Sequence, residues 1–310
     1  MTTVVPKTSR SASAPSPKTK EDKDTTPLRP ARVFLHACLI VVSLAWLLPL
    51  LWAAYTSLRP YDETAANGYV SVAKTLTLEN YRKAFEQGDL VLHFKNTMLI
   101  VVPSLILILA LSSMVAFVVS RFKFRGQIPL LMLFTAGNLL PQQVIITPLY
   151  RIYRDMPLPE WMSDSGTLFD SFWGIILIHV AFQIGFCTFV LSNYMKTLPE
   201  ELTEAARVDG ASAWRQYWQI TLPLCRAPIA ALATLEFTWV YNDFFWALVL
   251  MVSGDKRPIT SALNNLQGQF FVDNNLVAAG SLIVALPTVL IYFLLQKQFI
   301  GGLTLGATKG

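Results

Sequence analysis

Long apolar stretches constrain this chain more than any other feature. Six of them run through the 310 residues, at 34–58, 97–120, 128–150, 172–194, 227–252 and 276–295. A bilayer core about 30 Å thick takes roughly 20 helical residues to cross. Lipid offers the backbone no hydrogen-bond partners, so helices are the expected form, and the stretches are too long and too evenly apolar for barrel strands. We therefore predict an all-α polytopic membrane protein with six transmembrane helices, the third interrupted by Pro141.

Composition and charge agree with this class. Only 15% of the residues are charged and the mean hydropathy is +0.45, whereas soluble domains carry about 25% charged residues. Six crossings put both termini on one side, and that side, with loops 121–126 and 196–226, holds 16 of the 25 Lys and Arg residues. Such an excess marks the cytoplasmic side. The basic balance therefore indicates topology and not nucleic-acid binding.

The regions outside the apolar stretches predict a simple domain organisation. Residues 1–30 are rich in Ser, Thr, Pro and Lys and should form a disordered cytoplasmic tail. Residues 31–300 form the six-helix domain, and residues 301–310 a cytoplasmic C-terminal tail. The apolar run after Val33 is too long for a cleavable signal peptide. The three Cys and three His residues are scattered without ligand spacing, so neither a disulfide framework nor a metal site is expected.

The polar loop at 196–226 predicts two short helices. Thr197 to Glu200 resembles a helix start, and Leu198, Leu202 and Ala205/Ala206 form an apolar stripe at helical spacing. Gly210 should end the first helix in a left-handed conformation, and Ser212 should cap the second. A small helical wedge of this kind can fill a groove on a partner, although it can also pack only on its own bundle.

The same loop carries a specific pattern. Glu-Ala-Ala is followed by Gly six residues after the Glu and by an Ile-x-Leu-Pro ending. This resembles the EAA signature of permease subunits in bacterial ABC importers, where the loop docks onto the ATPase. The resemblance implies an ATPase-coupling role for eight residues: Glu204, Ala205, Ala206, Asp209, Gly210, Ile220, Leu222 and Pro223.

The likeness extends from about Thr97 to Gly310, where the chain resembles the second permease of maltose-type sugar importers. The stretch 237–244 is similar to the family's FxxxWNxF pattern, although Tyr241 stands where Trp is usual and Trp239 lies two positions earlier. The C-terminal stretch 302–310 resembles the G-x-x-x-G tail that such permeases extend toward the ATPase pair.

Membership of this family implies the type I permease fold of ABC importers, in the bacterial cytoplasmic membrane, with both termini cytoplasmic. It also implies a second homologous permease, two ATPase subunits, an extracytoplasmic solute-binding protein, a carbohydrate substrate and contact with membrane lipid, but no nucleic acid. ATP and magnesium would be bound by the ATPases, so this subunit would be no enzyme and would hold no cofactor. The sequence agrees, since it has no G-x-x-x-x-G-K-[ST] phosphate loop.

Polar residues inside the apolar stretches are candidates for the solute path. Glu236 and Asp243, seven residues apart, should share one helix face that meets a cavity or a partner, because acids are costly in lipid. His179 and Gln183 likewise share a face. Sugars are recognised by amides, carboxylates and aromatic faces, which selects Asn138, Gln142, Gln183, Trp239, Tyr241, Asn242 and Asp243. Hydrogen bonds between helices are the competing interpretation of these side chains.

Three other functions stay open at this point. An ion-coupled secondary transporter could use Glu236, Asp243 and His179 as a proton relay, but six crossings are few for that class and the loop at 196–226 would have no purpose. An ABC importer permease for a non-sugar solute, such as glycerol phosphate, would share the loop. A membrane-embedded enzyme or assembly scaffold would need a catalytic constellation that the sequence does not show.

Overall fold

Helices provide nearly all the regular structure of the protein. The computed structural model describes residues 30–139, 141–266 and 272–304, without the side chains of 138–139 and 297–304. Within these residues the β pairing is limited to an isolated bridge between Pro157 and Thr167. The predicted all-α class is therefore confirmed, while the predicted tails fall largely outside the described residues.

Four of the six apolar stretches form long continuous helices. They are α1 (Pro30–Ser57), α4 (Leu90–Arg121), α7 (Phe172–Met195) and α14 (Asn274–Thr304), and each is long and apolar enough to cross a membrane. Both α4 and α14 extend beyond the predicted stretches. The chain through Pro49, which includes most of α1, forms one unit, and the chain from Leu50 forms a second unit that carries everything described below.

The third apolar stretch is a bent pair of helices. It comprises α5 (Gln127–Leu139), the 3₁₀ turn η1 (Gln142–Ile145) and α6 (Ile146–Asp155), and the two arms differ in direction by more than 40°. Pro141 lies between the arms in an extended conformation. Proline has no N–H to donate, so the predicted interruption is confirmed at this position.

The prediction of one helix over 227–252 is wrong. Helix α11 (Arg226–Tyr241) ends after 16 residues, about 24 Å, and the shorter α12 (Phe245–Leu250) follows after a break. On its other side α11 meets a helical segment, Ala213–Leu224, at a bend of 75°. If each bent pair is one span, the described residues contain up to six spans, in agreement with the predicted number.

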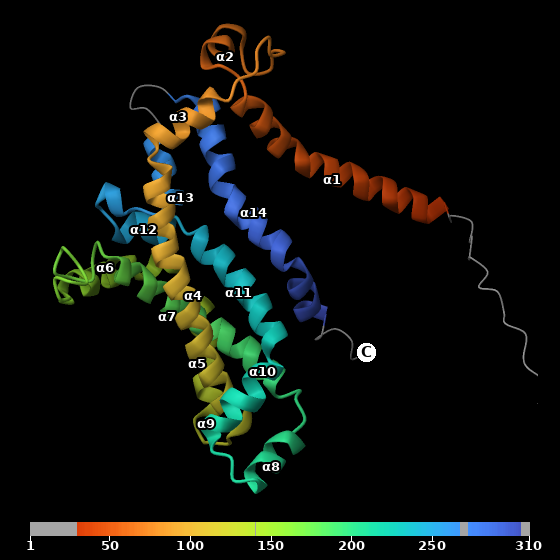
Figure 1. Cartoon of the computed structure of the whole chain (residues 1–310), viewed down its shortest axis with the longest axis vertical. Helices are drawn as coiled ribbons and strands as arrows, with labels where there is room; N and C mark the ends of the chain where they lie inside the picture. The colour runs from red at the N-terminus through yellow and green to blue at the C-terminus, as the bar shows by residue number, and fades with distance from the viewer. Residues whose placement is uncertain (1–29, 140, 267–271, 305–310) are drawn as a thin grey trace, which may run out of the picture. The chain divides into compact units, whose positions relative to one another are not determined.

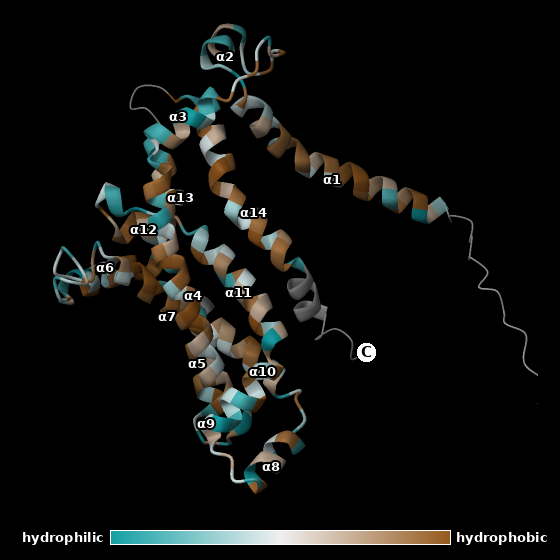
Figure 2. Cartoon of the chain, in the orientation of Figure 1, coloured by the Kyte–Doolittle hydropathy of each residue, from teal (hydrophilic) through white to brown (hydrophobic). Residues whose placement is uncertain are grey.

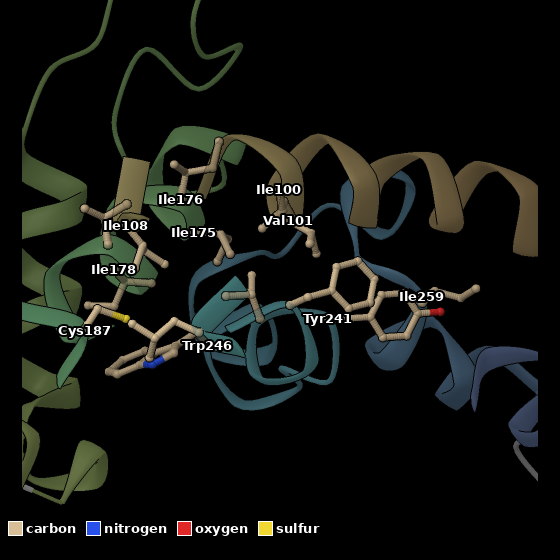
Figure 3. Packing of buried hydrophobic residues seen from close by; sticks show 14 of the residues in the cluster. Ile100, Val101, Ile108, Ile175, Ile176, Ile178, Cys187, Tyr241, Trp246 and Ile259 are labelled. Carbon is tan, nitrogen blue, oxygen red and sulfur yellow. The ribbon is translucent and has the colours of Figure 1, made fainter. Parts of the chain in front are cut away.

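The membrane helices of the second unit pack in pairs. Helix α4 lies along α7, and α11 lies along α14 (Figure 1). Figure 3 shows the buried packing between them, with Ile100 and Val101 of α4 near Tyr241 at the end of α11. Figure 2 shows that the long helices are mostly apolar, whereas polar residues gather on α3 and on the loop that holds α8 and α9.

One end of this unit is fixed by buried amides. Helix α2 (Tyr61–Asn67) and helix α3 (Glu79–Gln87) lie there, with α13 (Ile259–Ala262) and the 3₁₀ turns η3 (Gly254–Lys256) and η4 (Leu263–Leu266) between α12 and α14. The Asn80 side chain donates to the carbonyls of Ser57 and Arg59, and Asn275 of α14 donates to the same Arg59 carbonyl. Figure 1 places α3 and the α8–α9 loop at opposite ends of this unit.

Candidate functional site

A cavity of about 710 Å³ opens where α11 breaks. Its described lining is half polar and half aromatic. The polar residues are Gln142, His179, Gln183, Thr238, Asn242 and Asp243. The aromatic residues are Phe182, Phe186, Trp239, Phe244, Phe245 and Trp246. Ligand sites combine a largely apolar wall with a few convergent polar groups in this way.

Two side chains create the break that forms the cavity. Asn242 ends α11, and its Nδ2 donates to the Thr238 carbonyl one turn back at 2.8 Å. The Asp243 carboxylate then accepts from the backbone N–H groups of Trp246 at 3.3 Å and Ala247 at 3.2 Å, as the cap of a new helix does. A short polar side chain that bonds to nearby backbone competes with helix continuation, which explains why the apolar stretch does not stay helical through this point.

His179 faces this capping carboxylate from α7. Its Nε2 lies 3.6 Å from Asp243 Oδ2, and the two side chains are only 7% and 12% exposed. Among the described residues, Nε2 has no hydrogen-bond partner. A buried polar atom without a partner is uncommon in proteins, and in a cavity wall it is available to a ligand.

Aromatic rings flank these polar groups on both sides. Phe186 of α7 lies against Trp239 of α11 with ring centroids 5.4 Å apart, and Phe182 lies against Trp246 of α12 at 5.6 Å. The rings of the two pairs are tilted against each other by 55° and 40°. The cavity therefore presents ring faces beside a carboxylate, an imidazole and side-chain amides.

The structure brings together most of the predicted path residues. Gln142, Gln183, Trp239, Asn242 and Asp243 all line the cavity, while their role in a solute path stays a prediction. The side chain of Asn138, also predicted, lies outside the described residues.

Two interpretations from the sequence are wrong. Tyr241 is fully buried and donates its hydroxyl to the Val284 carbonyl of α14 at 2.9 Å, so it joins helices and does not line the cavity. Glu236 is also fully buried, and Cys187 of α7 donates its S–H to Glu236 at 3.0 Å. Glu236 and Asp243 do not share a helix face, because α11 has ended before Asp243.

Helical spacing in the sequence could have identified some of the cavity residues that were not among the predicted path residues. His179, Phe182, Gln183 and Phe186 follow the spacing i, i+3, i+4 and i+7, which defines one helix face. Once His179 and Gln183 are placed on a polar face, the two Phe residues belong there too. No comparable signal marks Phe244, Phe245 and Trp246, because their positions depend on the break in α11.

The polar loop forms the predicted pair of helices. Helix α8 (Glu201–Val208) ends before Gly210, which has φ +74°, and Ser212 caps α9 (Ala213–Gln216) by accepting from the Arg215 N–H. A π-helical turn, η2 (Tyr217–Thr221), and the short α10 (Leu222–Leu224) complete the second segment. Both the glycine stop and the serine cap are therefore confirmed.

Burial within this loop is limited. The buried residues of α8 are Thr203 and Ala206, while Leu202, on the predicted apolar stripe, is 43% exposed. Glu204, Ala205, Asp209 and Gly210 are exposed, whereas Ile220, Leu222 and Pro223 are half-buried. Val208 and Trp214 are 88% and 61% exposed. This outward face combines acidic, small and apolar residues, and nothing in the described part of the chain covers it.

Tyr217 is one of the contacts that attach the loop to the membrane helices. Tyr217 is buried, its hydroxyl lies 2.8 Å from Ser113 Oγ of α4, and its ring contacts Phe117. The second loop segment is therefore packed on α4, while α8 projects beyond it.

Comparisons with known proteins identify the family. The family model described as "Binding-protein-dependent transport system inner membrane component" matches residues 82–299. The chain belongs to this family.

Relatives of this inner membrane component are ABC transporter permeases. A probable ABC transporter permease protein of Pyrococcus horikoshii is 33% identical over 267 residues, which cover 84% of this chain and 92% of the relative. A diacetylchitobiose uptake system permease protein of Streptomyces coelicolor is 29% identical over 276 residues, 88% of each chain. The solved structure of a bacterial ABC transporter involved in alginate import matches 87% of this chain and 98% of its own with a TM-score of 0.72 and 21% identity, which supports the fold. The predicted permease fold is thus confirmed, and the protein is an ABC transporter permease.

Proposed function

We propose that this chain forms half of the translocation path of an ABC importer for a sugar or oligosaccharide. The observation that carries the proposal is the cavity at the break in α11, where amides, a carboxylate, an imidazole and paired aromatic rings converge. A sugar ring offers hydroxyl groups at its edge and C–H groups on its faces, and this lining can bind both. Relatives named for sugar uptake, such as the diacetylchitobiose permease, support the same substrate class.

The exposed loop around α8 is the proposed docking point for a separate ATPase. Glu204 and Asp209 can accept charge-assisted hydrogen bonds from partner Arg or Lys side chains, and the small Ala205 permits close approach. The excess of Lys and Arg on the side of this loop supports a cytoplasmic location for that side and for both termini. The ATPases would hydrolyse ATP with their own magnesium, and this subunit would need no cofactor.

The full assembly would contain a second homologous permease, two ATPases and an extracytoplasmic solute-binding protein. ATP would bring the ATPases together and move the loop with them. The membrane helices would then open toward the binding protein, and hydrolysis would restore the inward state.

A proton relay is less well supported, because Glu236 bonds to Cys187 and is absent from the cavity lining that holds His179 and Asp243.

Reconstitution in liposomes tests this function. The full chain with its partner permease, the ATPases and the binding protein should take up a radiolabelled saccharide with ATP, whereas the chain alone should not. A matched preparation with an inactive ATPase is the control. Uptake by this chain alone under a proton or sodium gradient would contradict the proposal and support the secondary-transporter interpretation.

A further inference from the structure

We propose that Asp243 and His179 together make this cavity selective for uncharged saccharides and against acidic ones. The inference rests on the proposed function, since it names the charge class of the sugar that the same cavity accepts. It depends on the balance of charge in the lining and on one buried atom without a partner.

The lining holds an acidic side chain and no Lys or Arg among its described residues. Asp243 is the acid among the twelve described residues that line the cavity, and none of the twelve is Lys or Arg. The contacts of its carboxylate are the backbone N–H groups of Trp246 and Ala247, and the nearby His179 Nε2. A solute carboxylate or phosphate in this space would approach a like charge without a guanidinium or ammonium group to bind it, and both charges interact strongly where water is scarce. The lining therefore opposes acidic sugars and phosphorylated solutes.

The gap between His179 and Asp243 suits a hydroxyl group. Nε2 and Oδ2 are 3.6 Å apart, which is beyond a direct hydrogen bond. A hydroxyl oxygen can lie within bonding distance of both atoms, donate to the carboxylate and accept from the imidazole N–H. Such a group would give the buried Nε2 the partner that it lacks among the described residues.

The aromatic walls recognise the ring but do not read its charge. Trp239, which is 44% exposed and lies against Phe186, can stack on the C–H face of any pyranose, neutral or acidic. Discrimination therefore falls to the polar pair, and it works by repulsion of the wrong solute as much as by attraction of the right one.

A matched pair of trisaccharides tests the inference. β-1,4-Mannotriose and the β-1,4-mannuronate trisaccharide share the same ring and linkage and differ in a CH₂OH against a carboxylate. Binding of each is measured by equilibrium dialysis on the membrane complex of both permeases and the ATPases in nanodiscs. The solute-binding protein is left out, so that its own selectivity does not affect the result. We expect the wild type to prefer mannotriose by about tenfold or more, which is about 1.4 kcal/mol.

The variants separate charge from structure. Asp243→Asn keeps a capping oxygen but removes the charge, and it should reduce the preference to about twofold, mainly through tighter binding of the acidic sugar. Asp273→Asn is the matched control. Asp273 Oδ1 also accepts from two backbone N–H groups at a helix start, those of Asn275 and Leu276 in α14, but Asp273 does not line the cavity. His179→Leu should weaken mannotriose binding about tenfold, and His179→Gln, which keeps a polar tip, should restore most of it.

The outcomes distinguish this inference from the proposed function. Charge selection is overturned if the preference for mannotriose over the acidic trisaccharide is unchanged in Asp243→Asn, or is reduced equally in Asp273→Asn. It is also overturned if the wild type binds the two sugars with equal affinity. In these cases the proposed sugar site still stands. Binding of neither trisaccharide by the wild type overturns the assignment of a sugar site as well.

Discussion

At the scale of single residues, neighbours in the sequence have opposite roles. Tyr241 is fully buried, stacks on Phe237 with centroids 5.5 Å apart, and bonds to α14. Asn242 directly follows it, is exposed, and lines the cavity. Successive residues around a helical turn point about 100° apart, so the two side chains meet different surroundings at the end of α11.

Tyr241→Phe should therefore affect stability and not solute binding. The Val284 carbonyl loses its bond from the Tyr241 hydroxyl, and the expected cost is about 1 kcal/mol of the free energy of unfolding. Thermal unfolding of the purified importer in detergent measures the first effect, and mannotriose binding measures the second. A large loss of mannotriose affinity at an unchanged unfolding temperature would contradict this prediction and support a role for Tyr241 in the solute path.

Gly210 is limited by its backbone and not by space. Its φ is +74°, and no atom lies within 4 Å of the position that a Cβ would take. Gly210→Val should cost about 1–2 kcal/mol locally, because a branched side chain disfavours this region, whereas Gly210→Asn should cost less. We expect Val, but not Asn, to weaken co-purification with the ATPase subunits. Equal behaviour of the two variants would show that the left-handed turn is not needed for docking.

At the scale of elements, α12 is held at both ends by an aspartate. Asp243 caps its start, and Asp170, in the loop before α7, accepts from the N–H groups of Val252 and Ser253 and from the Ser253 hydroxyl beyond its end. The Asp170 N–H also donates to the Leu250 carbonyl. The short helix that forms one wall of the cavity therefore depends on contacts outside itself.

The Asp170 contact should depend on pH. Burial opposes ionisation, but the bonds from Ser253 and Val252 and the nearby Lys256 outweigh it, and the pKa of Asp170 lies below its ordinary value. The folded protein therefore binds a proton less readily than the unfolded chain, so this contribution is present at neutral pH and is lost as the pH falls below about 4. Asp170→Asn should lower the unfolding temperature at pH 7, and the difference from the wild type should shrink at pH 3.5.

Asp164→Asn is the matched control for this prediction. Asp164 also pairs with Lys256, at 2.9 Å, but its side chain is 84% exposed. Exposed ion pairs contribute about 0–1 kcal/mol, so this variant should unfold close to the wild-type temperature. An equal effect of both substitutions would place the stabilisation in Lys256 and not in the bonds to the backbone beyond α12.

At the scale of the whole molecule, α11 connects the polar loop at 196–226 with the cavity. It begins at Arg226, directly after the loop segment, and it ends at Tyr241, beside the cavity. It also packs along α14 over its length (Figure 1). A rigid helix of this length can transmit a displacement of the loop to the cavity wall, which is the link that the proposed coupling requires.

Glu204→Lys tests this link. Reversal of the charge on the exposed face of α8 should weaken ATPase docking and so reduce the rate of ATP-coupled uptake at least tenfold. The affinity of the distant cavity for mannotriose should stay unchanged. Glu160→Lys is the control, because Glu160 is also an exposed acid but lies in another loop, and this variant should transport normally. Normal uptake by Glu204→Lys would contradict the docking role of this loop.

The sequence by itself determined the membrane class, the position of four of the six spans and the glycine-centred loop. These follow from local chemistry, because a span must satisfy its backbone within about 20 apolar residues and glycine adopts the left-handed turn without steric cost. The resemblance of the loop at 204–223 then led to the family that the comparisons confirmed.

Only the tertiary structure decided which polar residues meet in the cavity. Inside an apolar stretch, a polar side chain can bond to another helix, as Tyr241 and Glu236 do, or can face a cavity, as Asp243 does. Both arrangements avoid lipid, so sequence composition does not separate them. The break at Asn242 and Asp243 made the difference, because it ended the helical spacing on which the prediction for 227–252 depended.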